Sequence, residues 1–312
     1  MVAGLSCLMY QEVNRLFKIL TIKTNNINKK TTKVLPEPFL KWAGGKRQLL
    51  PELLARVELA APFNNYHEPF VGGGALFFAL YCRGHLADRS KTNTSIYLSD
   101  TNERIIEAYI GLRDFPEYVI AILRRHKHQH CKEYYYSIRA EVPDTLPERA
   151  ARIIYLNRTC FNGLYRENSR GEFNVPMGSY VNPRICDEEN HRAVAKTLQS
   201  VTLSSNPFEK ILDVAKPDDF VYFDPPYHPI SKTSSFTGYN KDSFNELDQC
   251  RLADTFKTLT ERGVKVLLSN SMTSLIQELY GAFTFDTVQA DRKVNSKADG
   301  RGKIAEALVR NF

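Results

Sequence analysis

A short apolar run that stops at two consecutive prolines constrains the fold of this chain more than any other feature. Residues 221–223, Val-Tyr-Phe, are apolar and β-prone, which predicts a buried strand. The strand has to end after Asp224, because Pro225 and Pro226 lack the N–H group that a ladder requires and their φ angle is fixed. Open α/β sheets bind ligands beyond the carboxyl ends of their strands. The pattern therefore predicts a rigid site at the end of a strand.

Residues 224–227, Asp-Pro-Pro-Tyr, which we call the ledge, carry groups suited to an exocyclic amino group. The Asp224 carboxylate and a proline-flanked carbonyl can accept both N–H bonds of an adenine N6, while Tyr227 stacks on the ring. Chemistry on a base in a duplex requires that the base leave the stack. The alternative is an ordinary surface turn, in which Asp-Pro-Pro is common. The strand before the ledge and the aromatic residue at its end favour the site.

A strand, a glycine turn and a helix are predicted at residues 66–77, Tyr-His-Glu-Pro-Phe-Val-Gly-Gly-Gly-Ala-Leu-Phe. In outline this is the first βα turn of a nucleotide-binding sheet, with the cofactor at the N-terminus of the helix. The complete glycine fingerprint is absent, because Phe77 stands where the third glycine would be. Residues 95–100 predict a second strand that ends in Asp100, about where an acid would bind ribose hydroxyls.

Residues 39–47, Phe-Leu-Lys-Trp-Ala-Gly-Gly-Lys-Arg, invite comparison with a phosphate-binding P-loop. The comparison fails, because Leu40 stands where glycine is required and Arg47 replaces the Ser or Thr that would hold Mg²⁺. The segment therefore argues against a nucleotide triphosphatase. Its glycines instead allow the backbone to approach a ligand beside Trp42 and Lys46. A glycine turn next to a core tryptophan is the alternative.

The net charge of +7 resides in the N-terminal part of the chain. Residues 1–50 contain nine Lys and Arg against two Asp and Glu, whereas the remaining 262 residues carry 33 of each sign. We expect residues 1–36 to form a basic, mostly mobile leader, either a dispensable extension or a non-specific DNA-binding arm. A DNA-binding function therefore has to rest on motifs rather than on overall charge.

A cytoplasmic protein without a membrane span is expected. The sequence has no run of eighteen apolar residues and no pattern of a secretory signal. Its six cysteines are scattered without a C-x-x-C pair, which is typical of free thiols in a reducing compartment.

Between residues 102 and 190 the pattern changes to helical stretches, at 103–112, 118–125 and 148–156, separated by polar loops rich in aromatic residues. We expect an inserted helical subdomain at 102–190 within an α/β catalytic domain formed by 37–101 and 191–312. The stretch 124–131, Arg-Arg-His-Lys-His-Gln-His-Cys, lacks a second ligand pair at zinc spacing. It predicts a solvated or phosphate-facing surface, and we expect no metal site.

Residues 157–180 are rich in Asn, Arg and Gly between aromatic residues, and they predict an irregular hairpin. In the major groove Arg can read guanine and Asn can read adenine, so such a hairpin suits sequence-specific recognition. Composition alone favours a long polar loop equally.

Further along the chain, residues 231–244 predict a loop that closes over an everted base. The remaining residues predict a helix at 248–262 and a strand at 264–270. We expect the basic stretch at 291–310 to lie beside DNA.

Four segments together give the chain a resemblance to the DNA adenine-N6 methyltransferases of the Dam group (D12 class, alpha motif order). They are residues 39–46, 68–74, 170–176 and 224–227, in the order of the group, and the resemblance extends from about Phe39 to Phe312. It implies a Rossmann-like S-adenosylmethionine-dependent methyltransferase sheet with an inserted target-recognition subdomain. The implied substrates are S-adenosylmethionine and double-stranded DNA, with GATC as the target typical of the group. A restriction endonuclease of the same system is a candidate partner.

The resemblance also assigns residues to roles. The cofactor-binding positions of the group match Trp42, Lys46, Phe70, Gly72, Asp100 and Asp224. The catalytic positions that hold the target adenine match Asp224, Pro225, Pro226 and Tyr227. The DNA-binding positions match Lys41, Asn162, Leu164, Arg166 and Tyr180.

Direct methyl transfer is the expected mechanism, because acceptors for the N–H bonds of N6 would concentrate electron density on that nitrogen. None of the six cysteines follows a proline, as the nucleophile of a cytosine-C5 methyltransferase would. A cytosine-N4 methyltransferase would usually carry Ser in place of Asp224, and a protein-glutamine methyltransferase Asn. The rival from another class is a non-catalytic DNA-binding module on the same fold.

Overall fold

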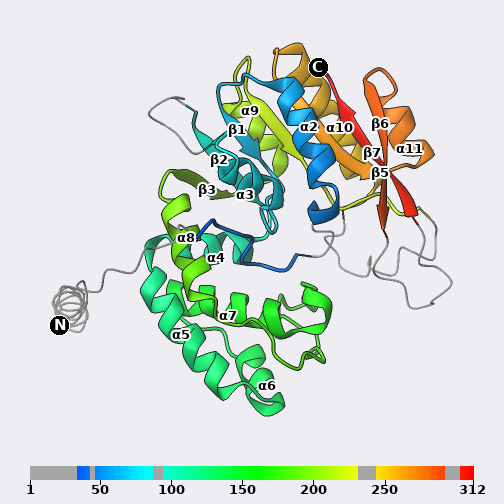
Figure 1. The fold of residues 1–312 in the computed structure, drawn as a ribbon. Helices are drawn as coiled ribbons and strands as arrows, with labels where there is room; N and C mark the ends of the chain where they lie inside the picture. The colour runs from blue at the N-terminus through cyan, green and yellow to red at the C-terminus, as the bar shows by residue number, and fades with distance from the viewer. Residues whose placement is uncertain (1–33, 43–45, 87–93, 231–243, 292–302) are drawn as a thin grey trace, which may run out of the picture. The chain divides into compact units, whose positions relative to one another are not determined.

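The computed structural model describes residues 34–42, 46–86, 94–230, 244–291 and 303–312 (Figure 1). Residues 35–312 form one compact unit. Of the predicted leader, residues 1–36, only the last three are described, and of the predicted loop at 231–244 only Phe244. The predictions for the rest of both segments therefore lie outside the described residues.

A seven-stranded sheet with the order β3-β2-β1-β4-β5-β7-β6 is the centre of this unit. Strands β1 to β5 are parallel where they pair, and β7 is antiparallel to both β5 and β6. The bounds are β1 Tyr66–Glu68, β2 Ile96–Asp100, β3 Val201–Ser205, β4 Phe220–Phe223, β5 Lys265–Ser271, β6 Thr284–Asp291 and β7 Lys303–Arg310. The strands predicted near residues 66, 95, 221 and 264 are all present, and the α/β fold class is confirmed.

Helices cover both faces of the sheet, as side-chain alternation along β4 shows. Phe220 and Tyr222 belong to the core that contains α2 (Leu50–Ala60) and α3 (Ala75–Cys82). Val221 and Phe223 belong to a second core with α10 (Glu246–Glu261) and α11 (Ser274–Tyr280). Successive strand residues point to opposite faces, so a run buried throughout requires packing on both sides (Figure 1).

The end of the chain differs from the prediction. Residues 303–310, expected within a basic stretch beside DNA, form β7, which is inserted between β5 and β6. Its residues Ala307, Leu308 and Val309 are fully buried. The prediction overlooked this strand because basic residues at both ends of the stretch concealed its apolar centre.

Between β2 and β3 the three predicted helices are longer than expected, and two further helices are present. The helices of this segment are α4 Glu103–Asp114, α5 Pro116–Gln129, α6 Lys132–Ala140, α7 Leu146–Thr159 and α8 Glu188–Leu198. Helices α6 and α8 were not predicted. Short segments complete the elements: η1 Lys46–Gln48, η2 Phe161–Gly163, η3 Phe208–Lys210 and α9 Ile211–Val214. Among the described residues, no helix combines the length and apolar character needed to cross a membrane.

The basic stretch 124–131 is only partly the solvated surface that was expected. His126 lies on the inner side of α5 and is 3% exposed. Its ring centroid lies 4.8 Å from that of Tyr155, and its Nδ1 lies 2.7 Å from the Tyr134 hydroxyl. Burial lowers the pKa of His126 to about 4. The helical period places one histidine of the run in the core while its neighbours face solvent.

Candidate active site and DNA-facing segment

The ledge begins where β4 ends, beside the carboxyl end of β5. Phe223 pairs with Leu268, so the next residues along the two parallel strands, Asp224 and Ser269, are neighbours. The Ser269 hydroxyl donates to Asp224 Oδ1 at 2.8 Å, and Lys46 Nζ lies 2.7 Å from the same oxygen. Burial raises the pKa of Asp224, while the Lys46 ammonium and both hydrogen bonds oppose the rise. With 21% of its side chain exposed, Asp224 remains accessible to a ligand.

The other end of the ledge is held from two sides. The Tyr227 hydroxyl donates to Glu306 Oε2 at 2.8 Å, which ties the ledge to β7. Gln249 of α10 donates to the Pro226 carbonyl at 3.0 Å. Lys46 Nζ lies 4.5 Å from the centroid of the Tyr227 ring, a cation–π distance. The ledge is therefore a preorganised surface with one carboxylate, one aromatic ring and a nearby ammonium group.

The glycine turn after β1 brings three predicted cofactor residues together. Gly72 has a φ of +45°, and a Cβ atom added there would lie 2.7 Å from Trp42 Cδ1. The Gly72 N–H donates to Asp100 Oδ2 at 3.0 Å. Burial raises the pKa of Asp100 to about 6, against the opposing effect of N–H donors from Asn102 and Gly72. Trp42, Gly72 and Asp100 therefore form one contiguous group.

Phe70, the remaining predicted cofactor residue, joins this turn to the ledge. Its ring stacks on Phe208 at 5.5 Å and meets Phe223 edge-on at 6.2 Å between centroids. Phe223 is the last residue of β4, immediately before Asp224. The half-buried Phe70 ring thus connects the glycine turn to the end of β4, where the ledge begins.

The topology explains why these parts meet. Strands β1 and β4 are adjacent and parallel, yet the chain continues from β1 towards β2 and from β4 towards β5, on opposite sides. Such a reversal of strand order is where open α/β sheets bind their ligands. The glycine turn and the ledge both follow this pair of strands at their carboxyl ends.

Residues 37–42, which we call the strap, connect the cofactor group to the predicted DNA-binding residues. Asn157 at the end of α7 pairs with the backbone of Lys41: its Oδ1 accepts the Lys41 N–H at 2.6 Å, and its Nδ2 donates to the Lys41 carbonyl at 2.8 Å. Trp42 follows directly, and its ring lies 5.8 Å from that of Tyr165. One amide side chain therefore fixes the junction between the two predicted sites.

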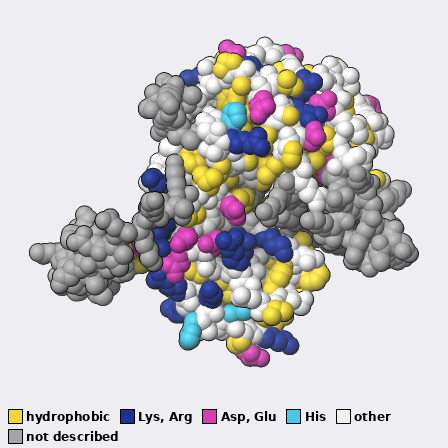
Figure 2. Space-filling view, in the orientation of Figure 1, with side chains coloured by type: hydrophobic (Ala, Val, Ile, Leu, Met, Phe, Trp, Pro, Cys, Tyr) yellow, Lys and Arg dark blue, Asp and Glu magenta, His cyan; other side chains and the backbone are white. Residues whose placement is uncertain are grey.

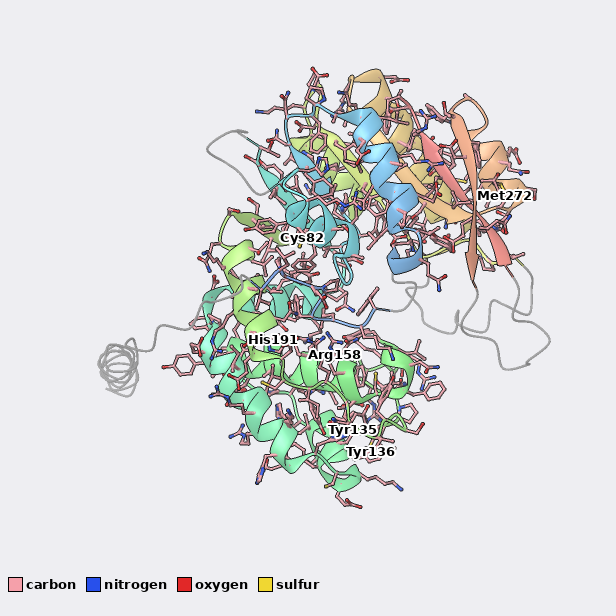
Figure 3. The ribbon with its side chains drawn as sticks, viewed as in Figure 1. Cys82, Tyr135, Tyr136, Arg158, His191 and Met272 are labelled. Atoms are coloured by element: carbon pink, nitrogen blue, oxygen red, sulfur yellow. The ribbon has the colours of Figure 1, made fainter. Side chains whose placement is uncertain are left out.

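The rest of the strap is held in a similar way. Arg158, which Figure 3 labels on α7, donates to the carbonyl of Phe39 at 2.9 Å and to that of Pro38 at 3.1 Å. Asn190 of α8 pairs with the backbone N–H and carbonyl of Glu37 at 2.8 and 3.0 Å. The strap lacks strand partners among the described residues, so these side chains satisfy backbone groups that a sheet would otherwise bind.

The DNA-binding residues predicted near the strap lie close together. Lys41 Nζ donates to the Tyr180 hydroxyl at 2.7 Å and lies 4.7 Å from the centroid of that ring. Gly163, with a φ of +65°, packs against Lys41, and an added Cβ would lie 2.8 Å from the Lys41 carbonyl oxygen. Its neighbour Asn162 also has a left-handed conformation, with a φ of +55°, and Leu164 is 37% exposed.

Arg166 lies on the predicted hairpin, which is present. The Asn174 N–H donates to the Arg166 carbonyl at 3.0 Å, and Glu167 pairs with Phe173 in a bridge. The exposed Arg166 guanidinium donates to Asn174 Oδ1 at 2.6 Å. This bond uses one of its five N–H donors and orients the others.

The face shown in Figure 2 carries Lys and Arg side chains dispersed among acidic and apolar ones, without one continuous basic surface. This agrees with the neutral balance of charge beyond residue 50. Among the described residues, no group of His, Cys, Asp and Glu is arranged to hold a metal ion.

Sequence reasoning missed several residues of the site. Ser269, Gln249 and Glu306 contact the ledge, and Asn157 holds the strap. Only Ser269 had a recognisable signal, because a Ser-Asn-Ser sequence closes an apolar strand at 269–271. The others depend on which elements pack together, which spacing along the chain does not show.

Comparison with known proteins gives a consistent result. The family model described as D12 class N6 adenine-specific DNA methyltransferase matches residues 42–294. The Type II methyltransferase M1.LlaDCHI of Lactococcus lactis subsp. cremoris is 42% identical, over 90% of this chain and 97% of the relative. The Type II methyltransferase M.MjaIII of Methanocaldococcus jannaschii is 39% identical, over 88% and 99%. The DNA adenine methylase of Escherichia coli K12 is 35% identical, over 87% and 94%. The chain therefore belongs to the D12 class of N6 adenine-specific DNA methyltransferases, enzymes that move a methyl group from a donor to adenine in DNA.

Proposed function

We propose that this enzyme uses S-adenosylmethionine to methylate adenine N6 within GATC in double-stranded DNA, by everting the base and transferring the methyl group directly. The observation that carries the proposal is the shared position of two groups of residues. Asp224 follows β4, and Gly72, which contacts both Trp42 and Asp100, follows the adjacent parallel strand β1 at the same carboxyl edge of the sheet.

The residues at the glycine turn fit S-adenosylmethionine. The absence of a side chain at Gly72 lets the Trp42 indole pack directly against the backbone of the turn, where an added Cβ atom would lie 2.7 Å from Trp42 Cδ1. Asp100 and Asp224 supply carboxylates for hydroxyl and ammonium groups, and Trp42, Lys46 and Phe70 complete the set. When bound, S-adenosylmethionine supplies an electrophilic methyl group on a sulfonium sulfur.

The ledge would bind the everted adenine. Asp224 accepts one N–H bond of N6, and a proline carbonyl accepts the other. The Pro226 carbonyl already accepts a bond from Gln249, which favours Pro225 for this role. The Tyr227 ring provides a stacking surface whose hydroxyl is held by Glu306. These acceptors concentrate electron density on N6 and stabilise the positive charge that develops there. Alignment of the reactants supplies up to roughly 7–11 kcal/mol of the barrier reduction.

Target recognition would lie at the strap and the hairpin. Lys41 and Tyr180 form one contact pair, Asn162 and Leu164 lie beside it, and Arg166 projects from the hairpin. Arg suits bidentate contacts with guanine, and an exposed apolar side chain suits the thymine methyl group. The Dam-group resemblance supports GATC. The helical part, residues 102–190, would then serve as the recognition subdomain of a catalytic domain built from 37–101 and 191–312.

The alternatives fit less well. A cytosine-N4 methyltransferase would usually present Ser at position 224, and the family match is to adenine-specific enzymes. A non-catalytic module would not need the ordered contacts around Asp224. Two relatives bear the name Type II methyltransferase, which favours a restriction endonuclease as a partner of the same system in the cytoplasm.

The test is to incubate the purified protein with labelled S-adenosylmethionine and duplex DNA that contains GATC and every single-base variant of it. N6-methyladenine confined to GATC is the expected product. Methylation of another sequence would replace GATC in the proposal, and N4-methylcytosine would overturn the assignment of the base.

A further inference from the structure

The side chain of Ser269 links the interior of the sheet to the ledge. It is fully buried near the carboxyl end of β5. Its Oγ lies 2.8 Å from Asp224 Oδ1 on one side and 3.0 Å from the Tyr222 hydroxyl on the other. The hydroxyl thus connects the carboxylate to a tyrosine that is 1% exposed.

The direction of this chain of hydrogen bonds follows from donor counting. Serine has one O–H hydrogen, and an ionised carboxylate can only accept. Ser269 therefore donates to Asp224, and Tyr222 has to donate to the Ser269 oxygen. A buried tyrosine hydroxyl needs such a partner, so the order Tyr222 to Ser269 to Asp224 satisfies all three groups.

The contacts of Asp224 also fix the orientation of its carboxylate. Ser269 and Lys46 both bind Oδ1, one from β5 and the other from η1. Two donors on one oxygen hold the carboxylate against rotation about its Cβ–Cγ bond, and the direction of Oδ2 is then set as well. A hydrogen bond to adenine N6 depends on that direction.

We propose that Ser269, held by Tyr222, is a positioning residue that orients the Asp224 carboxylate towards the amino group of the target adenine. The inference rests on the proposed role of Asp224. Ser269 itself touches neither the base nor the methyl donor and acts through Asp224.

The charges around Asp224 give this role a measurable consequence. Asp224 faces Lys46 from η1, Glu68 from β1, Tyr222 from β4, Glu306 from β7 and Tyr227 on the ledge itself. Burial raises the pKa of Glu68 to about 8, which disfavours the ionised form of this neighbour. Lys46 and Ser269 are thus the groups that favour the ionised form of Asp224.

Loss of the Ser269 hydroxyl removes a donor to the carboxylate, which raises the pKa of Asp224 further. If methyl transfer requires ionised Asp224, activity is lost as pH falls through that pKa. The acidic limb of the rate profile then moves to higher pH. One hydrogen bond to a charged group corresponds to a shift of about one unit in the pKa of Asp224. On the acidic limb of the profile, this shift lowers the rate about tenfold.

The experiment compares Ser269→Ala with Ser271→Ala in the full-length enzyme. Ser271 is also buried on β5, but its hydroxyl donates to the His228 carbonyl rather than to Asp224. Single-turnover methylation is measured from pH 5 to 9, with KM for S-adenosylmethionine and thermal unfolding as further readouts. We expect Ser269→Ala to show the lower rate and the shifted acidic limb with KM nearly unchanged, and Ser271→Ala to retain the parental profile.

Two further variants keep the inference falsifiable if Ser269→Ala folds poorly. Ser269→Thr retains the hydroxyl and should restore the parental limb, whereas Tyr222→Phe should move the limb in the same direction by less. Parental profiles for folded Ser269→Ala and Tyr222→Phe would overturn the inference. If Asp224→Ala remains active, the proposed role of Asp224 fails instead. An inactive Asp224→Ala together with an unchanged Ser269→Ala would remove Ser269 alone.

Discussion

The ledge and the hairpin that carries Arg166 are both short segments with proposed functional side chains, yet they are held very differently. The ledge has contacts from η1, β5, β7 and α10, which reach Asp224, Tyr227 and Pro226. Arg166 on the hairpin is exposed, and its described side-chain bonds go to Asn174 of the same hairpin. Catalysis by fixed electrostatics requires the first arrangement, whereas reading base edges requires donors that DNA can reach. Changes at the ledge should therefore affect rate, and changes at the hairpin should affect sequence choice.

The strongest test of this contrast is Asp224→Ala. We expect methylation to fall by at least about 10²–10³-fold, because a preorganised acceptor at the reacting nitrogen is lost. DNA binding should remain measurable by anisotropy, since the hairpin is unaffected. Near-parental turnover would show that the ledge does not carry the chemistry.

The second test concerns the proposed cofactor residues at the same carboxyl edge of the sheet. Gly72→Ala places a Cβ 2.7 Å from Trp42 Cδ1, whereas Gly84→Ala, at a φ of +85°, meets nothing within 4 Å. Both variants carry the strain of a left-handed alanine, roughly 1–2 kcal/mol, so the control isolates the crowding. We expect the Kd for S-adenosylmethionine, measured by calorimetry, to rise about tenfold more for Gly72→Ala. Equal effects would argue against a cofactor site beside Trp42.

Arg166→Ala tests the other half of the comparison. Loss of one base-reading arginine should reduce discrimination at one position of the target by about 1–3 kcal/mol, with a smaller effect on non-specific binding. Arg192→Ala on α8, which breaks an ion pair with Glu117, is the control. Methylation rates on all single-base variants of GATC measure the effect. Unchanged discrimination by Arg166→Ala would show that the arginine does not read a base.

The smallest effect should arise at the strap, which joins the two regions. Asn157→Ala and Asn190→Ala each remove a buried amide that pairs with strap backbone, and each should reduce the free energy of unfolding by about 1–3 kcal/mol. Of the two asparagines, Asn157 is the one that holds Lys41, the residue next to Trp42. Its loss alone should therefore also raise KM for S-adenosylmethionine and for DNA, by a few-fold. Identical kinetics for the two variants would mean that the strap is purely structural.

Much of the site could be predicted because its signals are local. A strand closed by two prolines, a glycine turn after a strand and an acid at the end of the next strand each need only neighbouring residues. The missing elements had no such signal. β7 pairs across the sheet with β5 and β6, and α6 is a helix of nine residues with one buried residue, Tyr135.

The sequence by itself determined four of the strands, the turns beside them and the chemical groups, because backbone restrictions at proline and glycine and the period of apolar residues act over a few positions. Only the tertiary structure decided which of these groups meet. Ser269 lies beside Asp224 because β4 and β5 pair in one particular register, and Asn157 reaches Lys41 across 116 positions of the chain. Register and helix packing depend on the burial of whole faces, so these contacts appear only when the complete core is assembled.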